Sequence, residues 1–266
     1  MVCHTKPEWA QLKAHFHSME GGLDLQAAFR QDPQRLAHLS QQAPHVFADL
    51  SKNWMLPQTE VLLSALAQAC EVHALRDAML AGQTINNTES RAVMHWLLRT
   101  PRDGGLLRTH PVVQQWTPQM QQALQSVHDT LDAMLTLAEQ VRAYPQITDV
   151  VNIGIGGSHL GPEVVVQALE DWVDGDKHFH FVSNVDGHEL GHVLRKVRPE
   201  NTLFLIASKS FTTAETMLNA RSAREWFLAH GGSPHPQDAC SIDQHFVALT
   251  TNTEAAAEFG ISRTLG

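Results

Sequence analysis

The sequence predicts an α/β fold, a parallel sheet with helices on both faces, which follows a helical N-terminal region. Short apolar runs that suit buried strands recur only after residue 145, and a helical pattern follows each of them. Before residue 145 the segments that show a regular apolar spacing have the helical period. We therefore expect two domains, a helical region at 1–145 and an α/β domain at 146–266.

The first region reads as a series of helices. In the segment that begins at Thr59, apolar residues recur at helical spacing, and Gly82 supplies a stop signal. The predicted helices are 9–16, 23–32, 34–42, 59–78, 90–98 and 112–143.

The second region alternates strands with helices. Strands are predicted at 148–154, 178–183, 202–207 and 245–250, and helices at 161–172, 187–197, 213–230 and 253–259. Parallel strands need crossover connections, which these helices supply.

Composition excludes several classes of protein. The chain has 266 residues, 43% of them hydrophobic, and a formal net charge of −9. That length suits one large domain or two small ones, and an acidic chain is a poor partner for nucleic acid. No apolar run is long enough to span a membrane, and the first twenty residues lack a signal-peptide core. The three cysteines are scattered, so we expect reduced thiols and a cytoplasmic protein.

A glycine-rich turn follows the first predicted strand. Gly154, Gly156 and Gly157 precede Ser158, which is a favourable helix N-cap. Free N–H groups and the helix dipole at such a turn attract anions, so we expect a phosphorylated ligand. The pattern matches neither the nucleotide P-loop, which needs a lysine after its last glycine, nor the G-x-G-x-x-G fingerprint. A tight structural corner without a ligand is the alternative.

A second polar turn follows the strand at 202–207. It consists of Ser208, Lys209, Ser210, Phe211, Thr212 and Thr213. Hydroxyls and helix N-terminal amides can surround a phosphoryl group without a metal, whereas an ordinary cap accounts for only one or two of the hydroxyls. Lys209 either pairs with the phosphate or projects into water, and we favour the second, with its backbone N–H as the binding group. Both turns lie at carboxyl ends of strands, where open α/β sheets bind ligands.

One apparent metal motif is a weaker signal. His188-Glu189-Leu190-Gly191-His192 matches H-E-x-x-H, a zinc-binding pattern when it lies within a helix. Here it opens a predicted helix, contains a glycine and has no identifiable third ligand. We therefore expect a solvated helix start and no metal.

These segments resemble the glucose-6-phosphate isomerase (phosphoglucose isomerase) family. The resemblance rests on V-N-I-G-I-G-G-S at 151–158, on F-V-S-N-V-D-G at 181–187 and on A-S-K-S-F-T-T-A-E-T at 207–216. Collinear matches also occur at 51–53, 85–95 and 245–261. The family carries a flavodoxin-like sugar-isomerase (SIS) domain, so the resemblance implies that fold for the α/β domain.

The resemblance implies a substrate and a set of contacts. The family interconverts glucose 6-phosphate and fructose 6-phosphate in glycolysis and gluconeogenesis, by proton transfer through an enediol, with no cofactor or metal. Its members are homodimers. Matched positions imply that Gly157 and Ser158 border the sugar phosphate, while Ser208, Ser210 and Thr213 bind the phosphoryl group and Lys209, Phe211 and Thr212 complete the loop. Glu215 and His159 are weaker candidates, Glu215 for contact with the sugar or with an arginine.

Two departures from the family pattern qualify this expectation. His159 stands where the family has aspartate, and Ser210 where it has threonine. The family's general-base glutamate, ring-opening histidine and late lysine match no position up to Gly266, so we expect no catalytic residue here and an inactive N-terminal portion. The alternative is a non-catalytic sugar-phosphate-binding module that regulates a partner.

Overall fold

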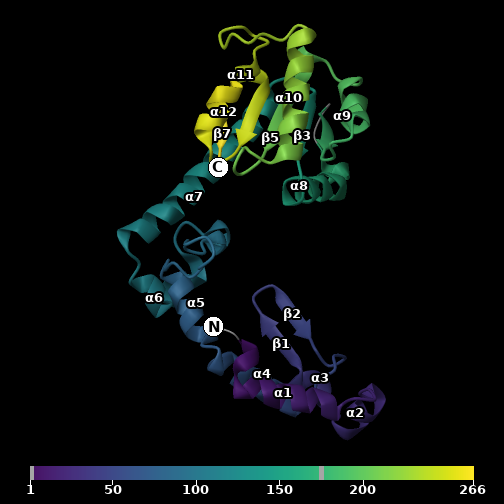
Figure 1. Ribbon diagram of the computed structural model, residues 1–266, viewed down its shortest axis with the longest axis vertical. Coiled ribbons are helices and arrows are strands. Elements are labelled where there is room, and N and C mark those ends of the chain that lie inside the picture. Colours follow the sequence, from purple (N-terminus) through teal and green to yellow (C-terminus); the bar gives the residue numbers. More distant parts are fainter. Residues whose placement is uncertain (1–2, 174–176) are drawn as a thin grey trace. The chain divides into compact units, whose positions relative to one another are not determined.

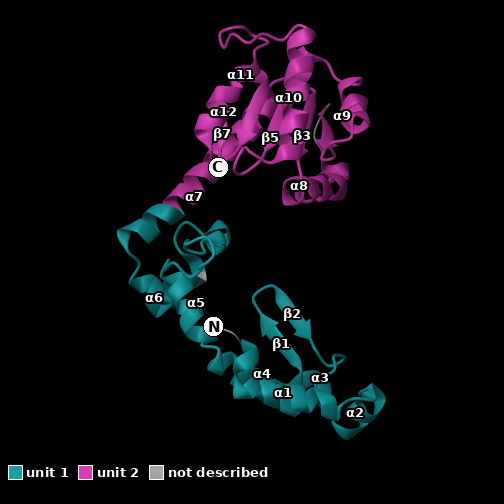
Figure 2. Ribbon diagram, viewed as in Figure 1, with its two compact units in different colours: residues 1–124 teal, residues 125–266 magenta. Residues whose placement is uncertain are grey.

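The computed structural model describes residues 3–173 and 177–266 (Figure 1). The chain forms two compact units, residues 1–124 and 125–266, which are coloured separately in Figure 2. The division falls within helix α7 (Pro118–Ala143). The domain boundary expected at 145/146 comes just after that helix and stays a prediction.

Unit 1 consists of short helices and one hairpin. Its elements are η1 (Cys3–Thr5), α1 (Pro7–Ser18), α2 (Leu25–Gln31), α3 (Arg35–His38), β1 (Ser40–Ala43), β2 (Val46–Asp49), α4 (Pro57–Ala69), α5 (Val72–Leu80), η2 (His95–Arg99), η3 (Gly105–Thr109), α6 (Pro111–Gln114) and the start of α7. Strands β1 and β2 pair antiparallel, with Ser40 opposite Asp49. Helices α1 and α4 pack against each other.

Four helices predicted for this unit are wrong in extent. The segment 34–42 is helical only at 35–38, because its end joins the β1–β2 hairpin. The helix expected at 59–78 breaks at Glu71, whose φ is 53°. Segment 90–98 forms only the 3₁₀ turn η2, and Arg91 pairs with Asn86 in an isolated bridge. Segment 112–143 divides at Thr117, whose hydroxyl accepts from the Met120 amide and so marks the start of α7.

Unit 2 is built on a five-stranded parallel sheet in the order β4-β3-β5-β6-β7. The strands are β3 (Asp149–Gly154), β4 (His178–Val182), β5 (Thr202–Ala207), β6 (Phe246–Leu249) and β7 (Thr264–Leu265). In chain order this is the 2-1-3-4-5 arrangement of flavodoxin-like folds, so the predicted fold class is confirmed. The first four strands match the prediction closely, whereas the short strand β7 was not predicted.

Helices connect these strands. They are α8 (Gly157–Ala168), α9 (Gly187–Leu194), α10 (Ala214–Ala229), α11 (Ile242–His245) and α12 (Thr253–Phe259), with 3₁₀ turns η4 (Glu170–Trp172) and η5 (Pro199–Asn201). Helix α8 begins four residues before its predicted start. Its N-cap is Gly156, so the prediction of Ser158 as the cap is wrong. The other crossover helices lie close to their predicted ranges.

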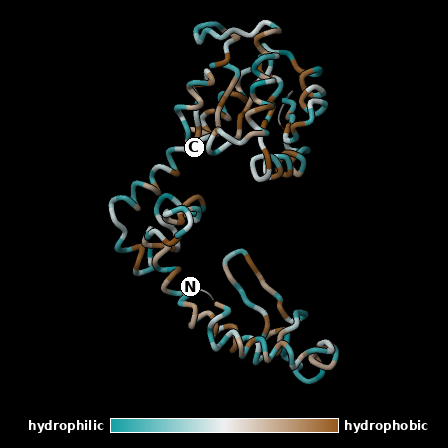
Figure 3. Tube along the Cα trace, in the orientation of Figure 1, coloured by the Kyte–Doolittle hydropathy of each residue, from teal (hydrophilic) through white to brown (hydrophobic). Residues whose placement is uncertain are grey.

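The two faces of the sheet are covered differently. On one face Ile153, Phe204 and Phe246 are completely buried beneath α9, α10 and α12. On the other face α7 and α8 cover the sheet only in part, and a groove of about 480 Å³ lies over Val150 and Leu205. Apolar segments of the chain run along the central strands of the sheet (Figure 3). This sheet holds the candidate site at its carboxyl ends.

Candidate functional site

The two polar turns predicted from the sequence leave the sheet at neighbouring positions. Strands β3 and β5 are adjacent (Figure 1). Gly154 pairs with Ala207 at their carboxyl ends. The connection after β3 leads to β4 on one side, while β5 and the later strands lie on the other. This reversal of strand order is the place where open α/β sheets bind ligands. We call residues 155–159 the glycine turn and residues 208–213 the hydroxyl loop.

The glycine turn depends on the absence of side chains. Gly156 has φ 55° and ψ −124°, a conformation that residues with a Cβ avoid. A Cβ at Gly154 would lie 2.9 Å from the Ser158 Cβ and 3.1 Å from the Ala207 Cβ. Asn152 Nδ2 donates to the Ser158 carbonyl at 2.9 Å. The start of α8 is therefore held close to the sheet, with Gly157 exposed and Ser158 half-buried.

His159 is engaged with side chains of its own neighbourhood. Its Nε2 lies 3.2 Å from a Glu163 carboxylate oxygen, and its ring meets Phe181 edge-on, with centroids 5.9 Å apart. Its side chain is only 15% exposed, and Nδ1 is buried without a hydrogen-bond partner. These contacts favour a packing role between α8 and β4.

The hydroxyl loop brings four hydroxyl groups together in two pairs. Ser208 Oγ donates to Thr213 Oγ1 at 3.1 Å, and Ser210 Oγ lies 2.6 Å from Thr212 Oγ1. Ser208 is buried, whereas Ser210 and Thr212 are exposed. Thr213 is the N-cap of α10, whose first amides have no intrahelical acceptor. Hydroxyls and amides that can donate to an anion are therefore concentrated at this helix end.

The other predicted residues of the loop have distinct surroundings. Phe211 is buried and has φ 56°, and its ring packs edge-on against Phe259 at 5.8 Å. It therefore anchors the loop and does not face solvent. Lys209 and Glu215 are exposed, and Glu215 lies in the first turn of α10, where a carboxylate complements the helix dipole.

Three residues at the end of β6, which were not predicted as site residues, hold the hydroxyl loop. Thr250 and Thr251 donate through their hydroxyls to the Lys209 carbonyl, at 2.9 and 3.1 Å. Asn252 Nδ2 donates to the Ser210 carbonyl at 3.1 Å. A signal for them exists in the sequence, since a hydroxyl-rich run follows an apolar strand there as it does at 208–213.

The turn after β4 shows what the H-E-x-x-H pattern does. Glu189 accepts hydrogen bonds from the amides of Ser183 and Asn184, both at 2.9 Å, so it closes the turn. Asp186 caps α9, and its pKa lies below the usual value because it accepts hydrogen bonds from the backbone and then the side chain of His188. Within residues 3–173 and 177–266, no cluster of three or more His, Cys, Asp or Glu side chains could hold a metal ion.

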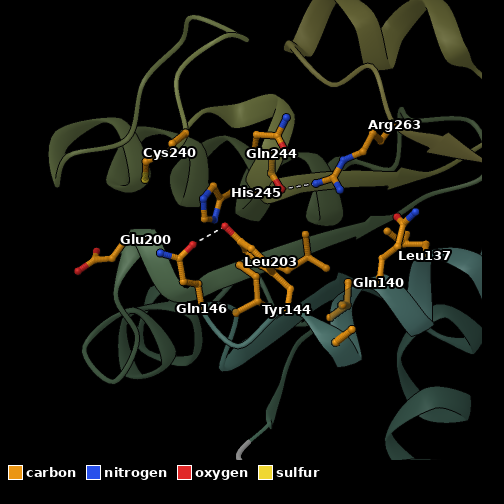
Figure 4. Close-up of a pocket in the computed structure, with 14 residues that line it drawn as sticks. Leu137, Gln140, Tyr144, Gln146, Glu200, Leu203, Cys240, Gln244, His245 and Arg263 are labelled. Carbon is orange, nitrogen blue, oxygen red and sulfur yellow. Dashed lines mark hydrogen bonds between the residues drawn. The ribbon is translucent and has the colours of Figure 1, made fainter.

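A second hollow lies at the opposite end of the sheet. Its volume is about 610 Å³, and Leu137 and Leu203 form part of its apolar wall (Figure 4). Arg263 donates to the Gln244 carbonyl at its rim. His245 is buried there with its Nδ1 2.7 Å from the Thr202 carbonyl, and burial lowers its pKa. None of the site residues predicted from the sequence lines this hollow.

Among the residues that the structure describes, no helix combines the length and the apolar character that crossing a bilayer requires.

Comparisons with known proteins identify relatives that match nearly every residue of this chain. The family model of phosphoglucose isomerase matches residues 49–265. "Glucose-6-phosphate isomerase" of Albidiferax ferrireducens is 53% identical over 264 residues, which is 99% of this chain and 48% of that protein. The protein of the same name from Polaromonas naphthalenivorans is 52% identical over 271 residues, 99% of this chain and 49% of that protein.

A solved structure supports the same fold. The crystal structure of a glucose-6-phosphate isomerase from Chlamydia trachomatis aligns with a TM-score of 0.77 at 23% identity, covering 100% of this chain and 48% of that one. The chain thus spans about half the length of the relatives it matches. Because the family model covers most of the sequence, from before α4 to β7, the chain belongs to the phosphoglucose isomerase family.

Proposed function

We propose that this chain carries the sugar-phosphate-binding part of a glucose-6-phosphate isomerase and holds the phosphoryl group of glucose 6-phosphate or fructose 6-phosphate in the hydroxyl loop. The observation that carries the proposal is the pairing of the four loop hydroxyls at the start of α10. The hydroxyl pairs can open so that each oxygen donates to a phosphoryl oxygen instead of to its neighbour.

The glycine turn is the second part of the proposed site. The Gly154–Ala207 pairing brings it to the edge of the sheet from which the hydroxyl loop also leaves. Gly157, exposed at the first position of α8, leaves its backbone open to a ligand, and Ser158 adds a hydroxyl. The sugar phosphate would then meet two helix N-termini, which accounts for binding without a metal or organic cofactor.

We further propose that these residues bind substrate but do not isomerise it by themselves. Moving a proton between two carbons requires a base close to the substrate. In the two turns and the first residues of α10, Glu215 supplies the only carboxylate, and it is exposed. Catalysis would therefore depend on residues that relatives carry outside the matched half. A cytoplasmic location belongs to the same proposal, whereas the homodimeric state is proposed for full-length family members and not for this chain by itself.

Calorimetric titration with fructose 6-phosphate tests the binding site. The chain should bind this ligand saturably and should not bind fructose, which lacks the phosphoryl group. The Ser208→Ala/Thr213→Ala variant should lose most of the affinity, because it removes one hydroxyl pair. Thr136→Ala is the matched control, since it removes a hydroxyl on α7 that donates to the Asp132 carbonyl.

A coupled isomerase assay on the same preparations tests the second claim. We expect no turnover above background, and measurable turnover by the purified chain would overturn it. If the chain does not bind fructose 6-phosphate, or if the double variant binds as tightly as the control, the proposed phosphate site is wrong.

A further inference from the structure

We propose that Thr250, Thr251 and Asn252, at the carboxyl end of β6, are positioning residues that hold the hydroxyl loop in its phosphate-binding shape. This inference rests on the proposed function. We call the three residues the β6 clamp. They do not belong to the hydroxyl loop, and they act on it through its backbone carbonyls.

The clamp concentrates its hydrogen bonds on two consecutive carbonyl groups. The Lys209 carbonyl accepts from both threonine hydroxyls and also from the Thr251 amide, at 3.1 Å. The Ser210 carbonyl accepts from Asn252. The Ser208 amide extends the connection by donating to the Leu249 carbonyl at 3.2 Å. These carbonyls therefore point toward β6, and an anion at the loop would not meet their negative ends.

Asn252 can hold the loop because its own orientation is determined by a second contact. Its Oδ1 accepts from the Ala255 amide at 3.1 Å and caps helix α12. An asparagine side chain whose oxygen caps the helix has its NH₂ group free to donate elsewhere, here to Ser210. The same side chain thus connects the start of α12 with the hydroxyl loop.

The loop needs such support because its backbone is strained. Phe211 has a positive φ, which is unfavourable for a residue with a Cβ and persists only where surrounding contacts enforce it. Its ring is anchored on Phe259, which closes the helix that Asn252 caps. Without the clamp the loop would sample other conformations, and a ligand would have to order it on binding. Preorganisation of this kind raises affinity by removing that entropic cost.

Substitutions at Thr250 and Asn252 can weaken the clamp while leaving every residue of the hydroxyl loop intact. Thr250→Val removes a hydroxyl at nearly constant volume, and Asn252→Ser keeps a helix cap but withdraws the amide donor. Together they should weaken fructose 6-phosphate binding about tenfold, which corresponds to about 1.4 kcal/mol. Thr250→Ser retains the hydroxyl, so it should restore part of the affinity when it replaces Thr250→Val in this double variant.

The matched control is Thr202→Val at the other end of the sheet. Thr202 is fully buried, and its hydroxyl donates to the Arg198 carbonyl at 2.7 Å. It should lower the melting temperature without changing the affinity. Amide hydrogen exchange provides a readout independent of ligand, because only the clamp variant should accelerate exchange within 208–213.

The outcomes separate this inference from the proposed function. Weaker binding together with faster exchange in the loop, both absent from Thr202→Val, supports the clamp. A clamp variant that binds fructose 6-phosphate as tightly as the unsubstituted chain overturns it, whether or not exchange accelerates. Failure of the unsubstituted chain to bind at all overturns the proposed function and the clamp with it.

Discussion

The two units of the chain are stabilised in different ways. In unit 2 buried aromatic rings lie between the sheet and the helices on one face, with Phe246 stacked on Phe204 at 4.7 Å between ring centroids. Unit 1 instead buries a charged side chain, that of Arg35, which is 2% exposed. Its guanidinium donates to the carbonyls of Ser51, Asn53 and Met55. The large clusters of buried apolar side chains therefore lie in unit 2, whereas in unit 1 a buried arginine holds irregular backbone through specific polar contacts.

The largest expected effect comes from a cavity in unit 2. Phe246 is fully buried, contacts Phe204 and also meets Phe227 edge-on at 5.3 Å. Phe246→Ala should lower the free energy of unfolding by about 3–5 kcal/mol, as expected for a large aromatic truncated in a core. Urea unfolding followed by circular dichroism measures it. The control is Leu135→Ala, which truncates a side chain that is 57% exposed. A loss below about 1 kcal/mol for Phe246→Ala would contradict a core centred on these rings.

A smaller but still large effect is expected in unit 1 from Arg35→Met. Methionine keeps much of the apolar stem but withdraws the donors from three carbonyls, and an unsatisfied buried acceptor costs about 1–3 kcal/mol. We expect a loss of about 2–3 kcal/mol in unit 1, with accelerated amide exchange at 51–55. Arg30→Met is the control, because Arg30 forms only an exposed ion pair with Asp24 at 3.8 Å and should change little. If the two variants were equally stable, the polar contacts would not carry unit 1.

This difference explains how much of the fold the sequence predicts. Strands such as 202–207 are apolar throughout because both faces of the sheet are covered, and periodicity alone detects them. The β1–β2 hairpin escapes detection, since Val46 and Phe47 are exposed and its strands carry no alternating pattern. The left-handed backbone conformation that divides α4 from α5 is adopted by Glu71, so no glycine indicates it in the sequence. The sequence therefore does not predict local backbone geometry that produces no pattern of buried and exposed residues.

In the candidate site, too, only the features that leave a pattern in the sequence were predictable. Its two turns were predictable because glycines and hydroxyls follow strands whose carboxyl ends must meet at one edge. The contacts of His159 with Glu163 and Phe181 were not predictable, because they depend on how α8 lies against β4. The β6 clamp depends in the same way on the register of two strands, since only the structure brings Thr250 to the Lys209 carbonyl.

The stability of unit 2 should also depend on pH, because unit 2 contains a buried histidine. Burial lowers the pKa of His245 below its ordinary value of 6.5, and this outweighs its hydrogen bonds to backbone groups of Thr202 and Ala239, which raise the pKa. Arg263 lowers this pKa further and Glu200 raises it, both to a smaller extent. Below pH 6.5 the unfolded chain therefore takes up a proton that the folded chain resists, so stability is complete above that pH and declines as the pH falls. His245→Asn preserves a donor toward the Thr202 carbonyl but cannot titrate. Its unfolding midpoint should fall less between pH 7 and pH 5 than that of the unsubstituted chain, and parallel curves would contradict the assignment.

The smallest effect on stability is expected from a substitution of Trp172. This substitution tests whether apolar side chains stabilise unit 2 only where they are buried or also where they are exposed. Trp172 is 82% exposed and lines the groove over the less covered face of the sheet. Because its indole loses little contact with water on folding, Trp172→Ser should change the free energy of unfolding by less than about 0.5 kcal/mol. Exposed apolar patches attract apolar fluorescent dyes. The groove should therefore bind such a dye less strongly after the substitution, although the stability hardly changes. A loss comparable to that of Phe246→Ala would mean that this face contributes to the core as much as the packed face does.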